Sequence, residues 1–221
     1  EGYWPLVREI CDRHGVLLIM DEVMCGMGRT GRWFAAEHYG AAPDILVLGK
    51  GLSGGTLALS AVGTTTALME TVRANCGNFA HGGTFSHNGV ACAAGLAAVA
   101  ILERERLVER AAQMGLHIGQ RLREALSDMP CVGDIRGIGM MWGVEIVRDK
   151  ATLTPFPRSA KVTEKVWQAL FERGVLLYKS VGLAGTDGDG LILSPPFVIS
   201  EAEIDLAVQS LRDALRAVLT A

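Results

Sequence analysis

Short apolar runs alternate with helical or glycine-rich segments in the first part of the chain. Apolar and charged residues recur at helical spacing from Leu6 to His14, and Gly15 then ends the pattern. Continuous apolar runs of strand length are typical of strands covered on both faces, so they predict an α/β fold. Three such runs follow Gly15: VLLIMD (residues 16–21), ILVLGK (45–50) and ALSAVGTT (58–65).

The pattern changes near Met129. Before this point, residues 89–127 predict one or two long helices, apolar and buried at first and charged later. We therefore divide the chain into part of a large domain, residues 1–127, and a small C-terminal α/β domain, residues 128–221. The small domain is predicted to contain strand-like segments at 133–146, 175–179 and 191–196, and helices at 159–173 and 200–219, the last with a capping-box pattern at Ser200 and Glu203.

The net charge, the cysteines and the longest uncharged stretch indicate which kinds of ligand the protein binds and where in the cell it is found. A formal net charge of −3 provides no general attraction to nucleic acid or to an anionic membrane, so small soluble ligands are expected. The five cysteines are odd in number and include no CxxC pair, which argues against a disulfide framework or a zinc site and fits a reducing, cytoplasmic location. Within the longest uncharged stretch, residues 74–102, the apolar part from 90 to 102 is too short to span a bilayer, so a buried helix is expected.

Two charged residues at the ends of apolar runs are candidates for chemistry. Asp21 ends the first run, and ligands of open α/β sheets collect outside the carboxyl ends of strands. A helix cap or an ion pair with Arg29 or Arg32 explains Asp21 equally well. Lys50 ends the second run, where partial desolvation would lower the pKa of its amine and favour Schiff-base formation. Taken alone, Lys50 is better explained as a lysine that extends to solvent.

The segment HGGTFSHN, residues 81–88, is a candidate phosphate site. Its glycines, the Thr84 hydroxyl and the helix predicted to begin near Gly89 are features that suit a phosphate, although an ordinary loop has the same composition. His81 and His87 match no usual metal spacing, and no Cys or acid joins them, so no metal site is expected.

Two longer segments resemble the class-III aminotransferases, which are fold-type I enzymes that use pyridoxal 5'-phosphate (PLP). They are LLIMDEVMCGMGRTGRWFAAEHYGAAPDILVLGKGLSGG, residues 17–55, and the later HGGTFSHNGVACAAGLAAV. The acid, the GxGRTG turn, the PDI strand and the lysine of KGLSGG occur in the family's order and spacing. The resemblance continues through RGIGMMWGVE and LSPPFVIS, so it covers essentially the whole chain.

The resemblance implies part of the large domain of PLP-dependent transferases, a mostly parallel sheet with helices on both faces. It also implies a role for each of four residues. Asp21 matches the acid that pairs with the pyridine nitrogen of PLP and keeps it protonated. Val23 resembles the residue packed against the ring, and Lys50 the lysine that holds PLP as an internal aldimine and moves the proton. Thr84 matches a threonine offered to the PLP phosphate of the neighbouring subunit, which implies a homodimer with a site built across its interface.

Other conspicuous residues fit structural roles. Arg29 and Thr30 are expected to orient the turn after Asp21, and Arg136 is likewise expected to be structural. The segment Met140–Trp142 is predicted to contribute to the core of the small domain at strand spacing.

The sequence also departs from the family pattern. Met24 stands where many relatives have Gln. Relatives often place an arginine between the positions of Arg173 and Arg212 to bind a substrate carboxylate, and this chain has none there. Lys179 could take the place of that arginine, but its ammonium group cannot make the paired hydrogen bonds of a guanidinium. A full family member is about twice this length, so the N-terminal half, with its glycine-rich phosphate loop and ring-stacking aromatic, is expected to be absent from this chain. We therefore expect weak or no independent activity.

The family resemblance predicts an aminotransferase that moves an amino group from an amine or amino acid to a 2-oxo acid or aldehyde through an aldimine at Lys50. The same residues would also support decarboxylation, racemisation or aminomutase chemistry. A further alternative is an incomplete, non-catalytic fragment.

Overall fold

The computed structural model describes residues 2–219, and its contacts divide the chain into two compact units, Glu1–Glu109 and Arg110–Ala221. Each unit contains both helices and strands, so the α/β prediction is confirmed. The predicted domain boundary at residues 127 and 128 refers to the complete family fold and stays a prediction.

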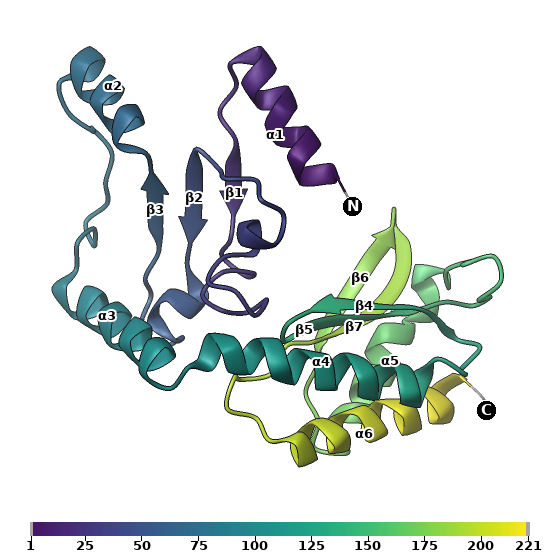
Figure 1. Ribbon diagram of the computed structural model, residues 1–221. Helices are drawn as coiled ribbons and strands as arrows, with labels where there is room; N and C mark the ends of the chain where they lie inside the picture. Colours follow the sequence, from purple (N-terminus) through teal and green to yellow (C-terminus); the bar gives the residue numbers. More distant parts are fainter. Residues whose placement is uncertain (1, 220–221) are drawn as a thin grey trace. The chain divides into compact units, whose positions relative to one another are not determined.

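The first unit contains a three-stranded sheet (Figure 1). Strand β1 pairs in parallel with β2, and β2 pairs antiparallel with β3. Its elements are α1 (Tyr3–His14), β1 (Ile19–Asp21), the short 3₁₀ helix η1 (Ala35–His38), β2 (Ile45–Leu48), the 3₁₀ helix η2 (Lys50–Ser53), β3 (Ala61–Thr64), α2 (Thr66–Cys76) and α3 (Gly89–Arg104).

The expectation of a mostly parallel sheet is therefore wrong for the strands of this chain. A parallel pair needs a long crossover, usually through a helix. The connection from β2 to β3 contains only the four-residue helix η2, and the chain returns antiparallel beside β2. The periodicity of an apolar run does not contain this information, since strands in either direction have the same pattern.

A small apolar cluster and an ion pair hold β1 and β2 to α1. Leu18 and Met20 are buried, and Trp4 and Val7 of α1 pack against them. The Asp44 carboxylate accepts the Leu18 N–H at 2.7 Å and an Arg8 N–H at 2.8 Å. These two hydrogen bonds lower the pKa of Asp44. Together they fix the start of β1 beside the start of β2.

Helix α3 differs from the expectation of a buried helix. Only Ala91, Gly95 and Leu102 are buried, and η2 packs against the helix on this side. A Cβ atom on Gly95 would lie 2.6 Å from Leu59 Cδ2, so any larger residue there would require the Leu59 side chain to move. Val90 and Leu96 are exposed, because no described segment of the chain covers their side of the helix.

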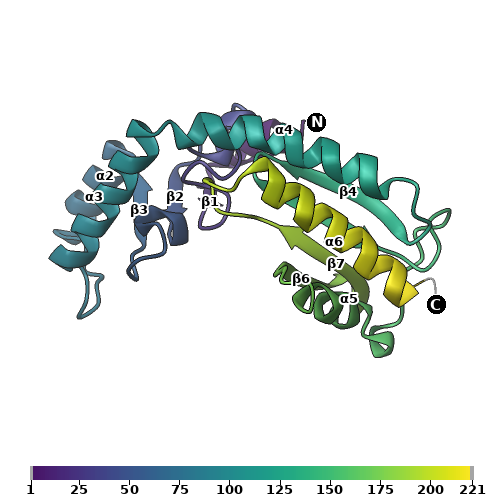
Figure 2. The same ribbon diagram turned by 90° about the horizontal axis from the view of Figure 1, so that it is seen from below.

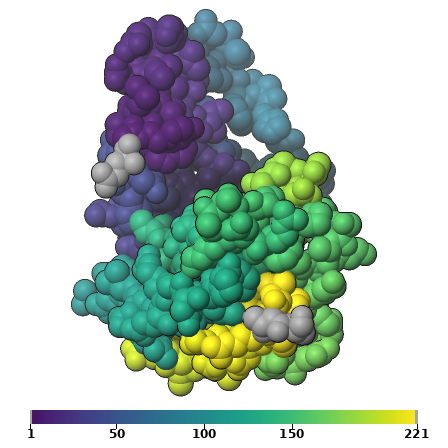
Figure 3. All heavy atoms as spheres, turned by 90° about the vertical axis from the view of Figure 1, so that its right-hand side faces the viewer, coloured from purple at the N-terminus to yellow at the C-terminus, as the bar shows by residue number. Residues whose placement is uncertain are grey.

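The second unit is a two-layer α/β structure. Its four strands form an antiparallel sheet in the order β4-β5-β7-β6. Figure 2 and Figure 3 show α4 and α6 side by side, and Arg121 of α4 bonds Asp205 of α6 at 2.6 Å. Its elements are α4 (Leu107–Leu126), β4 (Val132–Ile138), β5 (Met141–Ile146), the 3₁₀ helix η3 (Arg158–Ala160), α5 (Val162–Phe171), β6 (Tyr178–Ala184), β7 (Asp187–Leu193) and α6 (Glu201–Leu219).

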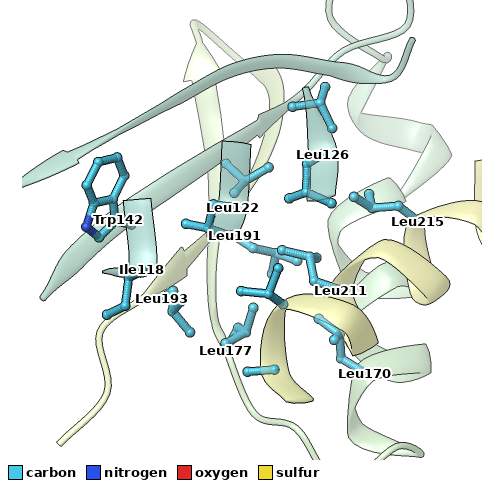
Figure 4. Packing of buried hydrophobic residues seen from close by; sticks show 14 of the residues in the cluster. Ile118, Leu122, Leu126, Trp142, Leu170, Leu177, Leu191, Leu193, Leu211 and Leu215 are labelled. Carbon is cyan, nitrogen blue, oxygen red and sulfur yellow. The ribbon is translucent and has the colours of Figure 1, made fainter. Parts of the chain in front are cut away.

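The core of this unit lies between the sheet and its helices (Figure 4). Trp142, Val144 and Ile146 alternate along β5 and are buried, as the strand spacing predicts. Met140 is also buried, whereas Met141 is half-buried. The capping box is confirmed, because Ser200 N–H donates to Glu203 Oε2 and Glu203 N–H donates to Ser200 Oγ.

Candidate active site

Asp21 and Lys50 lie at the carboxyl ends of neighbouring parallel strands. Asp21 is the last residue of β1 and is in register with Val47 of β2, so Lys50 is three positions further along the neighbouring strand direction. The Glu22 N–H extends this pairing by donating to Val47 O at 2.9 Å. Three residues of strand span about 10 Å. Both side chains are exposed at the same edge of the sheet, and a ligand at this edge can meet an acid and an amine.

Val23 lies between these two groups. A Cβ atom placed on Gly49 would be 3.4 Å from Val23 Cγ1, which puts the apolar Val23 side chain directly beside the residue before Lys50. The Val23 N–H donates to Asp21 Oδ1 at 2.9 Å and so fixes the direction of that carboxylate. The structure therefore brings together three of the four predicted residues.

Lys50 has an unusual backbone conformation. Its φ is 41°, in the left-handed region that residues other than glycine seldom adopt. Gly49 precedes it in extended conformation, and Lys50 opens η2, so the chain turns sharply at this lysine. Residues held in such conformations occur often at functional sites, because the surrounding structure must sustain the strain.

The turn after Asp21 packs against Gly49 and Gly51, the residues directly before and after Lys50. Besides the contact between Val23 and Gly49, a Cβ atom on Gly51 would lie 3.1 Å from Met27 Cβ, and Met27 is buried. The Gly26 N–H donates to Glu22 O at 2.9 Å. A Cβ atom on Gly26 would be 2.7 Å from that same oxygen, so the turn requires glycine there.

Glu22 is a buried residue to which the sequence alone assigns no role. Its side chain is only 2% exposed, and its two carboxylate oxygens accept the N–H groups of Ala35 and Ala36, each at 2.7 Å. A carboxylate directly after a buried strand, four residues before a glycine, is the sequence signal for this anchored turn. The local pattern does not distinguish the tasks of Asp21 and Glu22, because both acids follow the same apolar run.

Cys25 lies in the same turn but does not act as a nucleophile. Burial, and then the neighbouring Glu22 carboxylate, raise the pKa of Cys25 to about 11. The thiol therefore stays protonated at neutral pH, and the thiolate is the reactive form.

The other residues of the GRTG turn have structural contacts. Thr30 is buried, and its hydroxyl and carbonyl oxygens are each 3.1 Å from His38 Nε2. Arg29 is half-buried, and burial lowers its pKa. Met24, in the position where many relatives have Gln, is exposed.

Two cations of the second unit are engaged with neighbouring side chains. Arg136 bonds Asp134 at 2.8 Å and Glu145 at 2.6 Å, which matches the structural role expected for it. The Lys179 ammonium lies 4.6 Å from the centre of the Trp167 ring, a cation–π contact.

Thr84 is not part of the cluster around Asp21 and Lys50. It lies in an exposed loop, and the segment between α2 and α3 runs on the side of β3 away from β1 (Figures 1 and 2). Ser86 Oγ accepts the Gly83 N–H at 2.8 Å, and Asn88 caps α3 by accepting the Ala91 N–H. The loop has a defined turn just before a capped helix, and it presents Thr84 outward.

None of the helices within residues 2–219 combines the length and the apolar composition needed to cross a membrane. Within the same described part of the chain, no three His, Cys, Asp or Glu side chains are grouped so that they could hold a metal ion.

The sequence model of the family "Aminotransferase class-III" matches residues 1–215, and the chain belongs to this family. The resemblance found in the sequence is thereby confirmed.

Curated proteins of similar sequence include aminotransferases and an ammonia-lyase. An uncharacterized aminotransferase of Schizosaccharomyces pombe is 39% identical over 100% of this chain and 48% of its own length. A taurine–pyruvate aminotransferase of Bilophila wadsworthia is 35% identical over 98% of this chain and 48% of its own. An (R)-1-hydroxy-2-aminoethylphosphonate ammonia-lyase of Vibrio splendidus is 34% identical over 97% of this chain and 42% of its own. The chain spans about half the length of the curated relatives it matches.

Solved structures agree with the sequence relatives. A thermostable (S)-enantioselective omega-transaminase from Thermomicrobium roseum matches with a TM-score of 0.91 and 39% identity, over 99% of this chain and 47% of that one. An amine transaminase from an uncultivated Pseudomonas species, solved in its PLP-bound form, matches with a TM-score of 0.90 and 34% identity over 98% of this chain and 48% of that one.

Proposed function

We propose that the protein containing this chain is a PLP-dependent aminotransferase that moves an amino group from an amine or amino acid to a 2-oxo acid or aldehyde. The observation that carries the proposal is the register of β1 and β2, because it puts an acid and a lysine at one edge of a parallel pair of strands. Family membership supports the same chemistry, and a PLP-bound relative has the same fold over this region.

The residues at this edge fit PLP. A carboxylate suits a protonated pyridine nitrogen, an exposed lysine amine can condense with an aldehyde, and the methyl groups of Val23 offer an apolar surface to a flat ring. Gly49 adds no side chain of its own beside Val23, which leaves that surface open. When bound, PLP supplies an electron sink for charge that develops at the substrate carbon.

Each residue of the cluster then has a defined task. Asp21, oriented by the Val23 N–H, would keep the ring nitrogen of bound PLP protonated. Lys50 Nζ would hold the coenzyme and would serve as the group that moves a proton at the substrate carbon. The Val23 methyl groups would offer an apolar surface to the ring.

We propose further that Thr84 binds the coenzyme phosphate of a second subunit in a homodimer. Its outward position, on a loop away from the Asp21 and Lys50 cluster, supports a contribution to another site. The capped N-terminus of α3 next to this loop suits an anion.

The exposed apolar side chains of the first unit support the proposal that further chain completes the fold. Tyr3, Leu6 and Ile10 lie on α1 at helical spacing, and all three are exposed, as are Ile19 on β1 and Val62 on β3. Isolated exposed apolar residues are normal, but several of them on one small unit indicate surfaces that other parts of the protein cover. We propose that residues beyond this chain cover these side chains and contribute the rest of the phosphate site, so that the chain alone has weak or no activity.

A second candidate reaction is elimination, which the relatedness to an ammonia-lyase favours. Decarboxylation, racemisation and aminomutase chemistry would need the same acid and lysine, and no feature of the described residues favours any of them. A reducing, cytoplasmic location stays part of the proposal and is supported by five free cysteines.

A half-reaction experiment tests the proposed activity. Full-length protein reconstituted with PLP and given an amine donor without an acceptor should release about one equivalent of oxo product per site and then stop, because transfer proceeds in two halves. Addition of a 2-oxo acid should restart it. Continuous release of ammonia without an acceptor would identify a lyase instead, and failure to bind PLP would contradict both.

The position of Thr84 across the interface is tested by mixing two variants at a PLP concentration that loads the wild type but leaves Thr84→Ala largely without coenzyme. Thr84→Ala should weaken PLP binding about tenfold or more, since the hydroxyl would bond a charged phosphate. In randomly mixed dimers of Thr84→Ala and Lys50→Ala, half contain one copy of each, and one site of each such dimer is intact. About a quarter of wild-type activity should return. Activity no higher than that of the Thr84→Ala protein would contradict the proposal.

A further inference from the structure

We propose that Glu22 is a positioning residue for the Asp21 carboxylate. This inference rests on the proposed function, since it assigns Glu22 a role in holding the acid that would pair with the PLP ring. Glu22 is one residue from Asp21, yet its side chain is buried while that of Asp21 is exposed. The two acids at the end of β1 therefore have opposite environments and separate tasks.

The hydrogen bonds of Glu22 connect three segments. Its N–H donates to Val47 O on β2, and its carbonyl accepts the Gly26 N–H within the turn. Its carboxylate accepts the N–H groups of Ala35 and Ala36, in the first turn of η1. Glu22 thus joins the strand pair, the turn and the start of η1 at one buried point.

The direction of the Asp21 carboxylate depends on this point. The Val23 N–H, which orients Asp21 Oδ1, belongs to the peptide that directly follows Glu22. If the Glu22 carboxylate no longer held η1, the turn would lose its fixed end, and the N–H that orients Asp21 could rotate away. A buried carboxylate bonded by two N–H groups is the stronger kind of hydrogen-bonded anchor, because one partner is charged.

The variant Glu22→Gln tests this role in the full-length protein. Glutamine keeps the size of the side chain but loses the charge and one of the two acceptor oxygens. We expect the PLP dissociation constant to rise about tenfold, the usual effect of losing a hydrogen bond to a charged group. The visible absorption spectrum of bound PLP should change in the same direction as in Asp21→Asn, because both variants weaken the contact to the ring nitrogen.

A second variant, Ala35→Pro, is suited to the local backbone. Proline at the first helical position is well tolerated, and Phe34, with φ −129° and ψ 143°, already has the conformation that precedes proline. The change deletes the N–H that donates to Glu22 Oε2 and leaves Glu22 itself intact. Ala35→Pro should also raise the PLP dissociation constant, by about a third of the factor expected for Glu22→Gln. It also keeps the test possible if Glu22→Gln fails to fold.

A matched control and a double variant separate positioning from general stability. Thr163→Val removes a buried hydroxyl bond to Asp189 in the second unit, and it should lower thermal stability without changing the PLP spectrum. In an Asp21→Asn background, Glu22→Gln should change PLP affinity by less than about twofold, since residues that act through one another are not additive.

The outcomes distinguish the two proposals. Full additivity of Glu22→Gln and Asp21→Asn, or an unchanged spectrum in both Glu22→Gln and Ala35→Pro, would overturn the positioning role. If Asp21→Asn alone left PLP affinity and spectrum unchanged, the proposed function itself would fail.

Discussion

Lys50→Ala in the full-length protein should leave a colourless protein with transamination slowed by about 10⁴-fold or more. The substitution removes both the amine that would hold PLP and the group that would move the proton, and general acid–base catalysis alone contributes up to about 10⁴-fold. The absorbance of purified protein after incubation with PLP, and single-turnover rates with an amine donor, measure the two effects separately.

Two lysine variants serve as controls for this experiment. Lys50→Arg keeps the positive charge but cannot form a Schiff base, so it should be as inactive as Lys50→Ala. Lys165→Ala, at an exposed lysine on α5, should keep the activity and colour of the wild type. Retention of more than about a tenth of the activity in Lys50→Ala would show that the amine at the end of β2 is not the reacting group.

Gly115→Ala should destabilise the protein by about 1–3 kcal/mol, the range of overpacked core substitutions. A Cβ atom on Gly115 would lie 2.3 Å from Gly139 O and 2.4 Å from Gly139 C, in the turn between β4 and β5. These are backbone atoms, and the turn cannot withdraw freely because Met140 and Trp142, just after it, are buried.

The sign of this change makes the prediction informative. Alanine is favoured over glycine in a helix interior by about 1 kcal/mol, so helix propensity alone predicts a more stable protein. Gly119, one turn further along α4, has the same requirement, because a Cβ atom there would lie 2.3 Å from Trp142 Cζ2. The two glycines form a flat strip on which the hairpin rests.

Urea unfolding of the full-length protein, followed by tryptophan fluorescence, measures the difference. Gly89→Ala is the matched control, since Gly89 is also helical and a Cβ atom there meets nothing within 4 Å. It should be neutral or slightly stabilising. Equal stability of Gly115→Ala and the wild type would mean that the hairpin turn can move away from α4.

The comparison of sequence and structure separates local from non-local information. The helix that ends at Gly15 was predictable because a left-handed residue there lets its N–H bond the last helical carbonyls, which glycine does at little cost. The Ser200 and Glu203 box was predictable because both partners lie within one turn. Asp21 and Lys50 were identified because each ends an apolar run, and the family resemblance joined them.

The arrangement of these elements was less accessible. The antiparallel return of β3 depends on pairing between residues distant in sequence. The exposure of Val90 and Leu96 depends on which segments pack against α3. The apolar composition of the helix predicts burial but does not say which segment buries it. The roles of Glu22 and Gly115 cannot be predicted from the sequence, because they depend on contacts with Ala35, Ala36 and Gly139 that no local pattern contains.

The sequence by itself determined the order and type of the main elements, the family, and the acid and lysine of the candidate site, because periodicity, caps and motifs are written in neighbouring residues. Only the tertiary structure decided that β1 and β2 bring Asp21 and Lys50 to one edge, that Glu22 is buried beneath the turn, and that the segment between α2 and α3, to which Thr84 belongs, runs on the side of β3 away from β1. These features follow from strand register and side-chain burial, which arise when distant segments pack together.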